Sequence, residues 1–487
     1  MSKKESVFNF FSSVPVKIEG DILVYQCKCG VQRKQKKKSG YSNLLSHIHS
    51  SHNDNASSSS QPKMEFFYSN KAKNIFSWID WIVSENREFQ FCEKELVRKY
   101  SKLEPISCNS LMKYIDLLVK NVELKIKNSL PSKFGLVLDG WTDKSTHYIA
   151  VFAIFPSDSN RREILLAFSP LLDESDLTAD SVRSFLKFIL ENVYGKGLSN
   201  VTFLVADNAT VNKRLADLLN IPLIGCFSHK LHLAIKLLLS QNEKTVSNVR
   251  EVMKKLRGLK RSAVLRRQTN LSPLLDNETR WSSAYWMLKR YFELLPFMDE
   301  SDVELCDLLP SPSENASLKS LLEKLNQFES VAQILQKSET NLSTARLIFN
   351  EIVIEFPELG KYLSADAQIV HSKGFESALH KVVQNQEIDE GERQIVDVFE
   401  TMPTDFSSDD SFISRALKRQ KMNPVMRDIL QLIPATSNIV ERLFSQAKLI
   451  KTDQRNMSPV VLESTVFLKV NHMFWNEASV DECINKC

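Results

Sequence analysis

The sequence is poor in glycine and has no long apolar run. Only 12 of its 487 residues are glycine, and neither a Walker A loop nor a dinucleotide-binding fingerprint is present. This absence excludes the glycine-rich loops that commonly hold nucleotide phosphates. No apolar run reaches the roughly 18 residues of a membrane-spanning helix, and the charged first residues lack the apolar core of a signal peptide. We therefore expect an intracellular protein with no membrane-spanning segment.

Cysteines are few and scattered. Of the eight, only Cys27 and Cys29 lie close together, which argues against a disulfide framework and for a local metal site. Two cysteines on a hairpin and two histidines on a helix are the ligands of a small zinc module, which cannot fold on a hydrophobic core alone. We expect Cys27, Cys29, His47 and His52 to bind zinc and His49 to face away. The alternative is a basic tail with incidental cysteine and histidine.

Positive charge is concentrated locally. The net charge of +4 permits a nucleic-acid partner without requiring one. Basic residues gather at 33–38, 254–267 and 415–421. Such runs are usually solvated surfaces, so they indicate binding only where other features agree.

Hydrophobic periodicity divides the chain, which is long enough for at least two domains. Residues 56–63, which include four consecutive serines, predict a flexible linker. Apolar residues at intervals of three and four predict helices from 64 to 130 and almost throughout 238–425. Between them, residues 131–237 contain apolar runs rich in Val, Ile and Phe. These runs predict a mixed sheet flanked by helices.

Two predicted strands end in a carboxylate. Buried residues 136–138 precede Asp139, and the run 201–206 precedes Asp207. A rigid strand end suits a group that must keep its position during chemistry, and two such aspartates indicate a metal site. Each has a structural alternative, because Asp139 also fits a turn before Gly140 and Asp207 also fits a helix cap.

Five segments, taken in order, resemble motifs of the hAT superfamily of DNA transposases. They are Leu138-Asp139-Gly140-Trp141-Thr142, Asp207-Asn208-Ala209-x-x-Asn212, Cys226-x-x-His229-x-Leu231-His232-Leu233, Thr279-Arg280-Trp281 and Glu441-Arg442-Leu443-Phe444-Ser445. The resemblance covers nearly the whole chain. Residues 25–52 resemble the family's BED-type zinc finger, and residues 432–475 resemble its C-terminal dimerisation region.

The resemblance implies an α/β fold with a ribonuclease H-like catalytic core interrupted by an all-α insertion. A small zinc finger and a helical domain would precede this core. The implied segments are a finger at 1–55, the linker at 56–63, a helical DNA-binding or dimerisation domain at 64–130, the first part of the core at 131–237, the insertion at 238–425, and the last part of the core with the dimerisation region at 426–487.

By the same resemblance, Asp139, Asp207 and Glu441 are the catalytic acidic triad, and His229 lies near the scissile phosphate. Three carboxylates can hold two divalent ions for an in-line phosphoryl displacement, and their hard oxygen atoms favour Mg²⁺ or Mn²⁺. Glu441 also fits a capping box at a helix start. Cys226, His229 and His232 lack an obvious fourth ligand, so we do not expect them to bind zinc.

The resemblance also assigns DNA contacts. Trp281 would stack on a base expelled when the flanking DNA end closes into a hairpin, Trp141 would assist, and Arg280 would contact a phosphate. A buried core position is the alternative for each tryptophan.

The implied protein is a nuclear transposase, a homodimer or larger assembly, that cleaves and joins double-stranded DNA and has no small-molecule substrate. One alternative is a captured transposase that acts as a DNA-binding transcriptional regulator without catalysis. Another is a helical adaptor with a zinc finger, in which Asp139 and Asp207 lie far apart.

Overall fold

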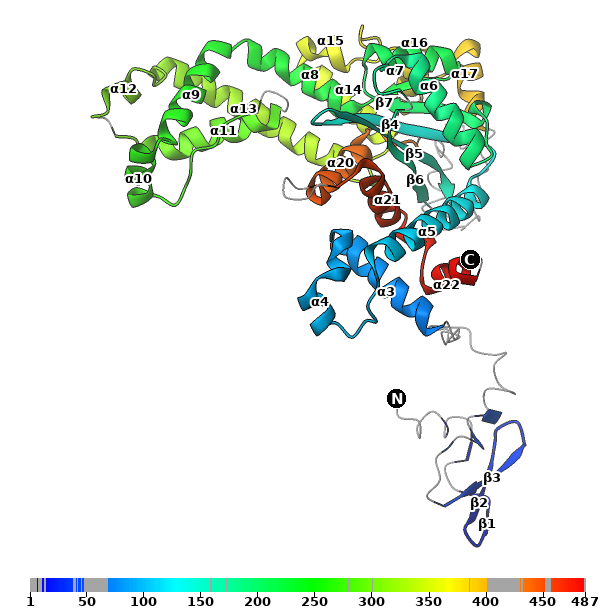
Figure 1. The fold of residues 1–487 in the computed structure, drawn as a ribbon. Helices are drawn as coiled ribbons and strands as arrows, with labels where there is room; N and C mark the ends of the chain where they lie inside the picture. The colour runs from blue at the N-terminus through cyan, green and yellow to red at the C-terminus, as the bar shows by residue number, and fades with distance from the viewer. Residues whose placement is uncertain are drawn as a thin grey trace. The chain divides into compact units, whose positions relative to one another are not determined.

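The chain divides into two compact units, Met1–Phe67 and Tyr68–Cys487 (Figure 1). The computed structural model describes residues 69–400 and 430–485, apart from 158–159, 172, 278–280, 300, 385, 431 and 452–456. In the smaller unit it describes residues 7, 11–12, 15–37, 41, 43–44 and 46–47. Within these residues no helix is long and apolar enough to cross a membrane. The predicted linker at 56–63 and the basic run 415–421 lie outside them.

The smaller unit is built on a three-stranded antiparallel sheet. Its strands are β1 (Lys17–Glu19), β2 (Ile22–Gln26) and β3 (Gln32–Lys36), in the order β1-β2-β3. Gly20 and Gly30 have φ angles of 61° and 89°, a conformation that glycine adopts without strain, and they lie in the turns after β1 and β2. Among the described residues of this unit, a buried apolar cluster comprises Val7, Phe11, Tyr25, Cys27 and Leu44.

The larger unit contains a five-stranded mixed sheet. Its strands are β4 (Phe134–Asp143), β5 (Thr146–Ser157), β6 (Asn160–Pro170), β7 (Val201–Ala206) and β8 (Leu223–Gly225), in the order β6-β5-β4-β7-β8. The strands β4, β5 and β6 are antiparallel neighbours, whereas β7 runs parallel to both β4 and β8. The predicted α/β class with a mixed sheet is confirmed.

Helices cover the sheet, which explains why β7 is buried along its whole length. In Figure 1, α6 (Ala179–Phe188) and α7 (Thr210–Leu219) lie on the opposite side from α20 (Asn438–Ile450) and α21 (Pro459–Val470). The helix α20 contacts β4 and β5, and α21 contacts β6. The segment near the C-terminus therefore belongs to the same core as the sheet.

The helices before the sheet pack against the end of the chain. These are α3 (Asn70–Ser84), α4 (Glu95–Tyr100) and α5 (Cys108–Ser129), and both α3 and α5 contact α22 (Glu477–Asn485). Lys125 Nζ donates to Ser479 Oγ at 2.6 Å, and Asn121 Nδ2 donates to Glu482 at 3.0 Å. Residues 69–129 thus form one body with the C-terminal helices.

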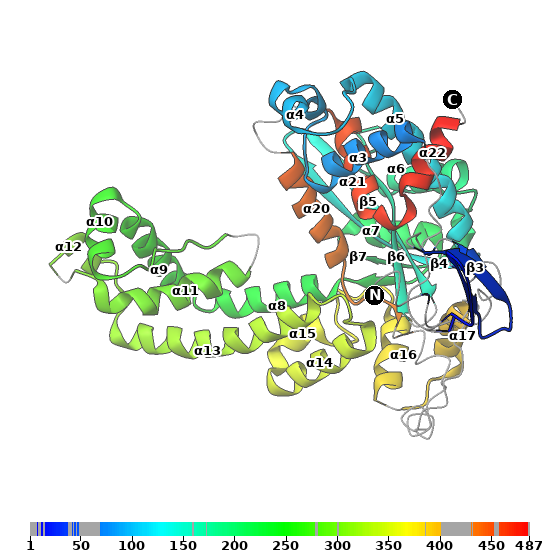
Figure 2. The same ribbon diagram turned by 90° about the horizontal axis from the view of Figure 1, so that it is seen from below.

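The segment after β8 is helical, as predicted. It comprises α8 (Phe227–Ser240), α9 (Glu243–Leu256), α10 (Leu259–Gln268), α11 (Trp281–Leu294), α12 (Val303–Cys306), α13 (Pro312–Leu335), α14 (Leu342–Glu355), α15 (Gly360–Leu363), α16 (Lys373–Val383) and α17 (Glu390–Glu400). Figures 1 and 2 show α8 and α13, which are in contact, running away from the sheet towards α9–α12. The helices α8 and α13 therefore form two sides of a helical arm that extends from the sheet.

A buried group of charges joins α8, α14 and α16. Lys230 forms an ion pair with Glu376, and Arg346 Nη1 lies 3.7 Å from the other oxygen of Glu376. All three side chains are only 1% exposed. Burial lowers the pKa of Arg346, while the Glu376 charge raises it. Lys230 and Arg346 thus share the Glu376 carboxylate, and the charge of Asp366 also raises the pKa of Arg346.

Candidate active site and metal centre

Asp139 and Asp207 occupy matching positions at one edge of the sheet. The parallel pairing of β4 with β7 places Val137 opposite Val205, and each aspartate lies two residues further along its strand direction. Neighbouring strands are about 4.8 Å apart. The two carboxylates are therefore neighbours, which contradicts the separation that the helical-adaptor interpretation needs.

The expectation that β4 ends at Asp139 is wrong. The antiparallel pairing of β4 with β5 continues from Asp139, opposite Ala150, to Asp143, opposite Thr146. What ends before Asp139 is the parallel pairing with β7, and burial falls at the same point. The Asp139 carboxylate accepts the Gly140 N–H at 2.8 Å. The backbone of Asp139 is thus held by the pairing with β5, while the residue lies beyond the last pair between β4 and β7.

Hydrogen bonds fix the orientation of the Asp207 carboxylate. Its Oδ1 accepts the Ala209 N–H at 3.0 Å and Asn212 Nδ2 at 2.6 Å. The first bond comes from the backbone of Ala209, which is itself the N-cap residue of α7, so Asp207 is not the helix cap that the structural alternative supposed. The Asn212 bond involves a residue of the same sequence motif. Both bonds hold the carboxylate without adding a positive charge.

Glu441 comes from α20, far along the chain. Two hydrogen bonds hold the start of this helix against the beginning of α8 and the end of α13, which we call the root of the insertion. Ser437 N–H donates to Cys226 Sγ at 3.4 Å, and Asn438 Nδ2 donates to the Leu335 carbonyl at 3.0 Å. Cys226 is 1% exposed, so its side chain is part of the packed interior. The capping box from Asn438 to Glu441, which was the structural alternative for Glu441, is absent, because the N-cap is Ser437 and its side chain makes no capping bond.

The electrostatics of Asp139 connect the three carboxylates. Burial raises the pKa of Asp139 to about 7; the Gly140 N–H lowers it, and the charges of Asp207 and Glu441 raise it further. Like charges at this site therefore oppose one another, and a bound cation would relieve the repulsion. Within the described chain, their oxygen atoms do not all lie within 4.8 Å of one another. The three carboxylates are therefore farther apart than the ligands of one metal ion.

His229 lies in the first turn of α8, half-buried, with its ring centroid 6.5 Å from that of His232. His232 Nδ1 accepts the backbone N–H of Trp281 at 3.4 Å. This bond joins α8 to the start of α11. Arg280 lies outside the described residues.

The two tryptophans assigned to DNA are engaged in packing. Trp281 is 7% exposed and belongs to the main core. Trp141 is half-buried and stacks on Phe168 and Phe444, with ring centroids 6.2 Å and 5.9 Å away. Both observations favour the core alternative in this conformation. Their DNA contacts stay predictions.

An exposed indole that the sequence reasoning missed lies on α11. Trp286 is 43% exposed, and Lys289 Nζ lies 5.1 Å from its ring centroid. The only signal in the sequence was a lysine three residues after a tryptophan, which places both on one helix face. Near the sheet, Asp143 at the end of β4 forms a 2.6 Å ion pair with Lys451.

The smaller unit contains a group of side chains that can bind a metal such as zinc. The ligand atoms of Cys27, Cys29 and His47 all lie within 4.8 Å of one another, and Cys29 Sγ is 3.2 Å from His47 Nε2. Zinc–ligand distances of about 2.0 to 2.3 Å place tetrahedral sulfur and nitrogen ligands roughly 3.5 Å apart. The fourth expected ligand, His52, lies outside the described residues.

A tight turn brings the two cysteines together despite the single residue between them. Cys27 N–H donates to the Val31 carbonyl at 2.9 Å, and Gly30 N–H donates to the Cys27 carbonyl at 2.8 Å. The positive φ of Gly30 closes this turn. Burial raises the pKa of the Cys27 thiol, so the neutral form is favoured until a cation binds.

No protein-family model matches the chain. The chain is 26% identical over 286 residues to a protein of Talaromyces stipitatus named "Putative transcriptional regulator tpeD". The match covers 49% of this chain and 34% of that protein. The chain thus spans about a third of the length of this curated relative.

Proposed function

We propose that the chain is a metal-dependent DNA transposase whose strand-cleaving site consists of Asp139, Asp207 and Glu441. The observation that carries the proposal is the alignment of Asp139 with Asp207 at the end of the β4/β7 pairing, together with the effect of the Glu441 charge on Asp139. Two aligned carboxylates and a third from a helix are donors suited to Mg²⁺ or Mn²⁺.

The sheet topology supports a ribonuclease H-like core. Three consecutive antiparallel strands are followed by two strands parallel to the first, and the first strand lies in the centre. Asp139 then lies on the central strand β4, and Asp207 directly follows its parallel neighbour β7. The helical insertion between β8 and α20 agrees with the interruption that the hAT resemblance implies.

The residues of this chain would position the reacting groups. The Gly140 N–H holds one oxygen of Asp139, while Asn212 and the Ala209 N–H hold Oδ1 of Asp207. These bonds limit carboxylate rotation, which preorganises the site. Bound divalent ions would supply the charge that activates the attacking oxygen and stabilises the leaving oxygen.

A second candidate is a DNA-binding transcriptional regulator that does not cleave DNA. It is favoured by the name of the Talaromyces stipitatus relative and by the metal-binding group Cys27, Cys29 and His47, which fits a DNA-binding finger. Both candidates place the protein in the nucleus with double-stranded DNA as its partner. The transposase would work as a homodimer or larger assembly.

The test compares cleavage and binding on the same DNA. The purified chain is incubated with the duplex that flanks its gene and with Mg²⁺ or Mn²⁺, beside the variants Asp139→Asn and Asp207→Asn. Asp180→Asn, an exposed aspartate in the first turn of α6, is the matched control. We expect hairpin-ended flanks on a denaturing gel from the native chain and from the control alone.

The other outcomes decide between the two candidates. If the native chain binds the duplex but neither metal supports cleavage, the regulator interpretation replaces the transposase. If Asp139→Asn and Asp207→Asn cut as well as the control, cleavage occurs elsewhere and the assigned triad is wrong.

A further inference from the structure

The outer end of the insertion carries a dense group of cations. Residues 254–267, at the end of α9 and along α10, include seven lysines and arginines. Three have carboxylate partners: Lys254 with Glu251, Lys255 with Glu304, and Arg261 with Asp302 and Glu304. The other four, Arg257, Lys260, Arg266 and Arg267, are exposed and form no ion pair with any described residue. We call these four the α10 basic surface.

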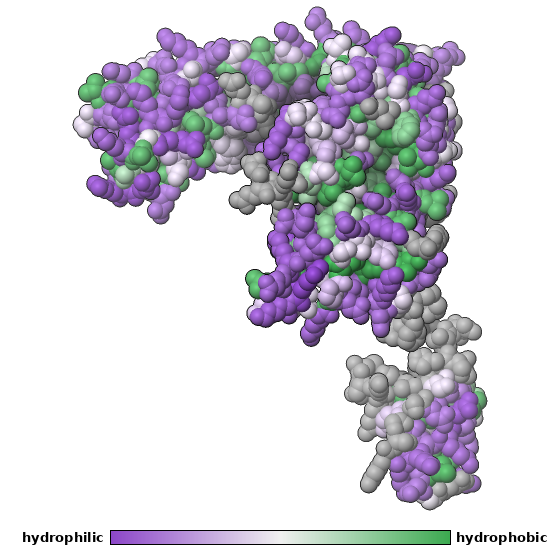
Figure 3. Space-filling model, viewed as in Figure 1, coloured by the Kyte–Doolittle hydropathy of each residue, from purple (hydrophilic) through white to green (hydrophobic). Residues whose placement is uncertain are grey.

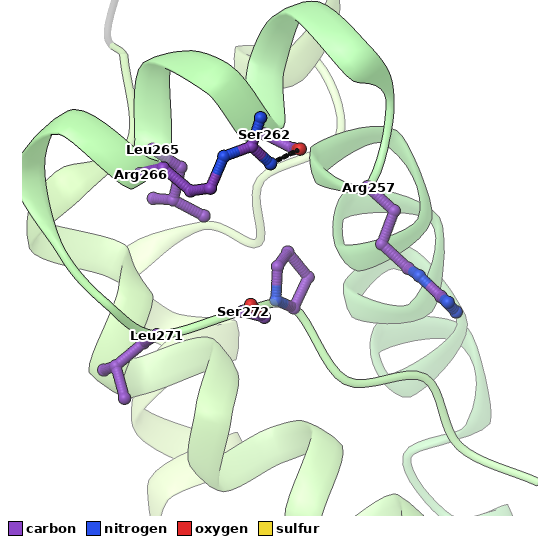
Figure 4. A pocket seen from close by; sticks show the side chains of 7 residues that line it. Arg257, Ser262, Leu265, Arg266, Leu271 and Ser272 are labelled. Atoms are coloured by element: carbon purple, nitrogen blue, oxygen red, sulfur yellow. Dashed lines mark hydrogen bonds between the residues drawn. The ribbon is translucent and has the colours of Figure 1, made fainter.

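A hollow lies within this surface. It has a volume of about 230 Å³ and is lined by Arg257, Ser262, Leu265, Arg266, Leu271, Ser272 and Pro273. Figure 4 shows Arg266 and Arg257 on two sides of it, with Ser272 of the following loop between them. Arg266 Nη1 donates to Ser262 Oγ at 2.7 Å, which holds the guanidinium beside the hollow. The lining thus offers cations and hydroxyl groups, the usual partners of phosphate oxygen atoms.

The loop behind the hollow is anchored to α11. Arg290 Nη1 donates to the Ser272 carbonyl at 2.6 Å, and Asn277 N–H donates to Ser283 Oγ at 2.7 Å. Among the described carboxylates near this loop, Asp276 forms an ion pair with Arg250, and Glu293 forms one with Arg290. Figure 3 shows that the outer end of the insertion is predominantly hydrophilic. An apolar protein partner is therefore a poor match for this surface.

We propose that the α10 basic surface binds the sugar–phosphate backbone of double-stranded DNA, independently of the zinc-finger unit. This inference rests on the proposed function only because it takes DNA as the ligand. Lys260 and Arg267 are seven residues apart on one helix face, a separation of about 10 Å along the axis. A DNA strand carries one charge about every 3.4 Å along the helix axis. The distance between Lys260 and Arg267 therefore lets them contact different phosphates of one strand.

The size of the hollow also favours a polymer backbone over an enclosed small molecule. Pockets that enclose drug-sized ligands have volumes of roughly 300 to 1,000 Å³, larger than this hollow. A single phosphate group can enter it while its neighbours contact Lys260 and Arg267 outside. Because no base-reading geometry is involved, the binding does not depend on sequence.

The test measures how DNA affinity of the full chain changes with salt. A fluorescent duplex of arbitrary sequence is titrated with the native chain and with Lys260→Gln/Arg266→Gln/Arg267→Gln across a range of NaCl concentrations. Each phosphate contact contributes about 0.9 to the slope of log affinity against log salt, so the triple variant should lose 2 to 3 from that slope. The matched control changes three other exposed lysines, Lys319, Lys324 and Lys337, to Gln and removes the same net charge.

A second measurement locates the contact without removing charge. A photo-crosslinking residue replaces Leu259, which is 90% exposed at the start of α10, and in a parallel chain it replaces Ile354, which is 73% exposed on α14. We expect DNA crosslinks from position 259 alone. Equal salt slopes for the two triple variants, or equal crosslinking at the two positions, would overturn the proposal. A loss of slope with duplex RNA but none with duplex DNA would overturn it as well. Failure of DNA cleavage changes neither readout.

Discussion

Replacing Glu463 with glutamine should stabilise the protein above pH 7. Glu463 is half-buried on α21, where burial raises its pKa to about 7 from the usual 4.5. A hydrogen bond from Ser169 lowers the pKa, and the charge of Glu123 on α5 raises it. Burial raises the pKa of Glu123 too. The ionised form of Glu463 is therefore poorly accommodated between α5, α21 and β6.

The sign follows from proton binding. Between pH 4.5 and 7 the folded chain keeps a proton on Glu463 that the unfolded chain has lost, so stability falls as the pH rises through this window. Each unit by which the pKa differs between the folded and the unfolded chain corresponds to about 1.4 kcal/mol of unfolding free energy. A pKa raised from 4.5 to about 7 thus costs up to about 3 kcal/mol at pH 8. Solvent contact at this half-buried position reduces the expected figure to about 2 kcal/mol.

Thermal unfolding from pH 5 to pH 8.5 measures the effect. Glu463→Gln should unfold at nearly the native temperature at pH 5 and about 2 °C above it at pH 8, since 1 kcal/mol shifts the midpoint of a unit of about 420 residues by roughly 1 °C. The control Glu351→Gln changes an exposed glutamate on α14 and should follow the native curve throughout. A difference between Glu463→Gln and native that stays constant with pH would refute the reasoning.

Three further expectations concern charge and metal. Glu376→Gln leaves Lys230 and Arg346 buried without their carboxylate, so we expect it to lower the unfolding free energy by about 3 kcal/mol in denaturant titrations. Cys29→Ser should abolish stoichiometric zinc, measured by elemental analysis of the full chain, whereas Cys306→Ser on α12 should not. Mg²⁺ or Mn²⁺ at ten times its dissociation constant should stabilise the native chain by about 1.4 kcal/mol and leave the melting curve of Asp139→Asn unchanged.

Local sequence patterns predicted the elements of the core but not their arrangement. The apolar runs before Asp139 and Asp207 are the buried parts of β4 and β7. The strand order depends on pairings between residues far apart in the chain, which no local pattern contains. The supposed end of β4 shows the difference, because Gly140 suggested a turn while pairing with β5 carries the strand to Asp143. Backbone hydrogen bonds to a neighbour outweighed the local preference.

The positions of the aromatic side chains were also beyond local reasoning. Trp281 and Trp286 lie on the same helix, yet one is 7% and the other 43% exposed. Which face of α11 is buried depends on its contacts with α9 and α13. Trp141 is covered by Phe444, a residue about 300 positions later in the chain. A motif identifies such a residue type but does not determine what packs on it.

The root of the insertion explains how Glu441 can act on Asp139 across such a long separation in sequence. The Phe227 N–H at the start of α8 donates to the Ala435 carbonyl at 3.0 Å, and Leu342 N–H donates to the Ile433 carbonyl at 3.0 Å. With the bonds from Ser437 to Cys226 and from Asn438 to Leu335, these contacts fix the segment before α20 against the start of α8 and against the connection between α13 and α14. Changes at the outer helices, including the α10 basic surface, can therefore alter DNA affinity while the three carboxylates keep their positions. A change at the root should instead move Glu441 and reduce its effect on Asp139.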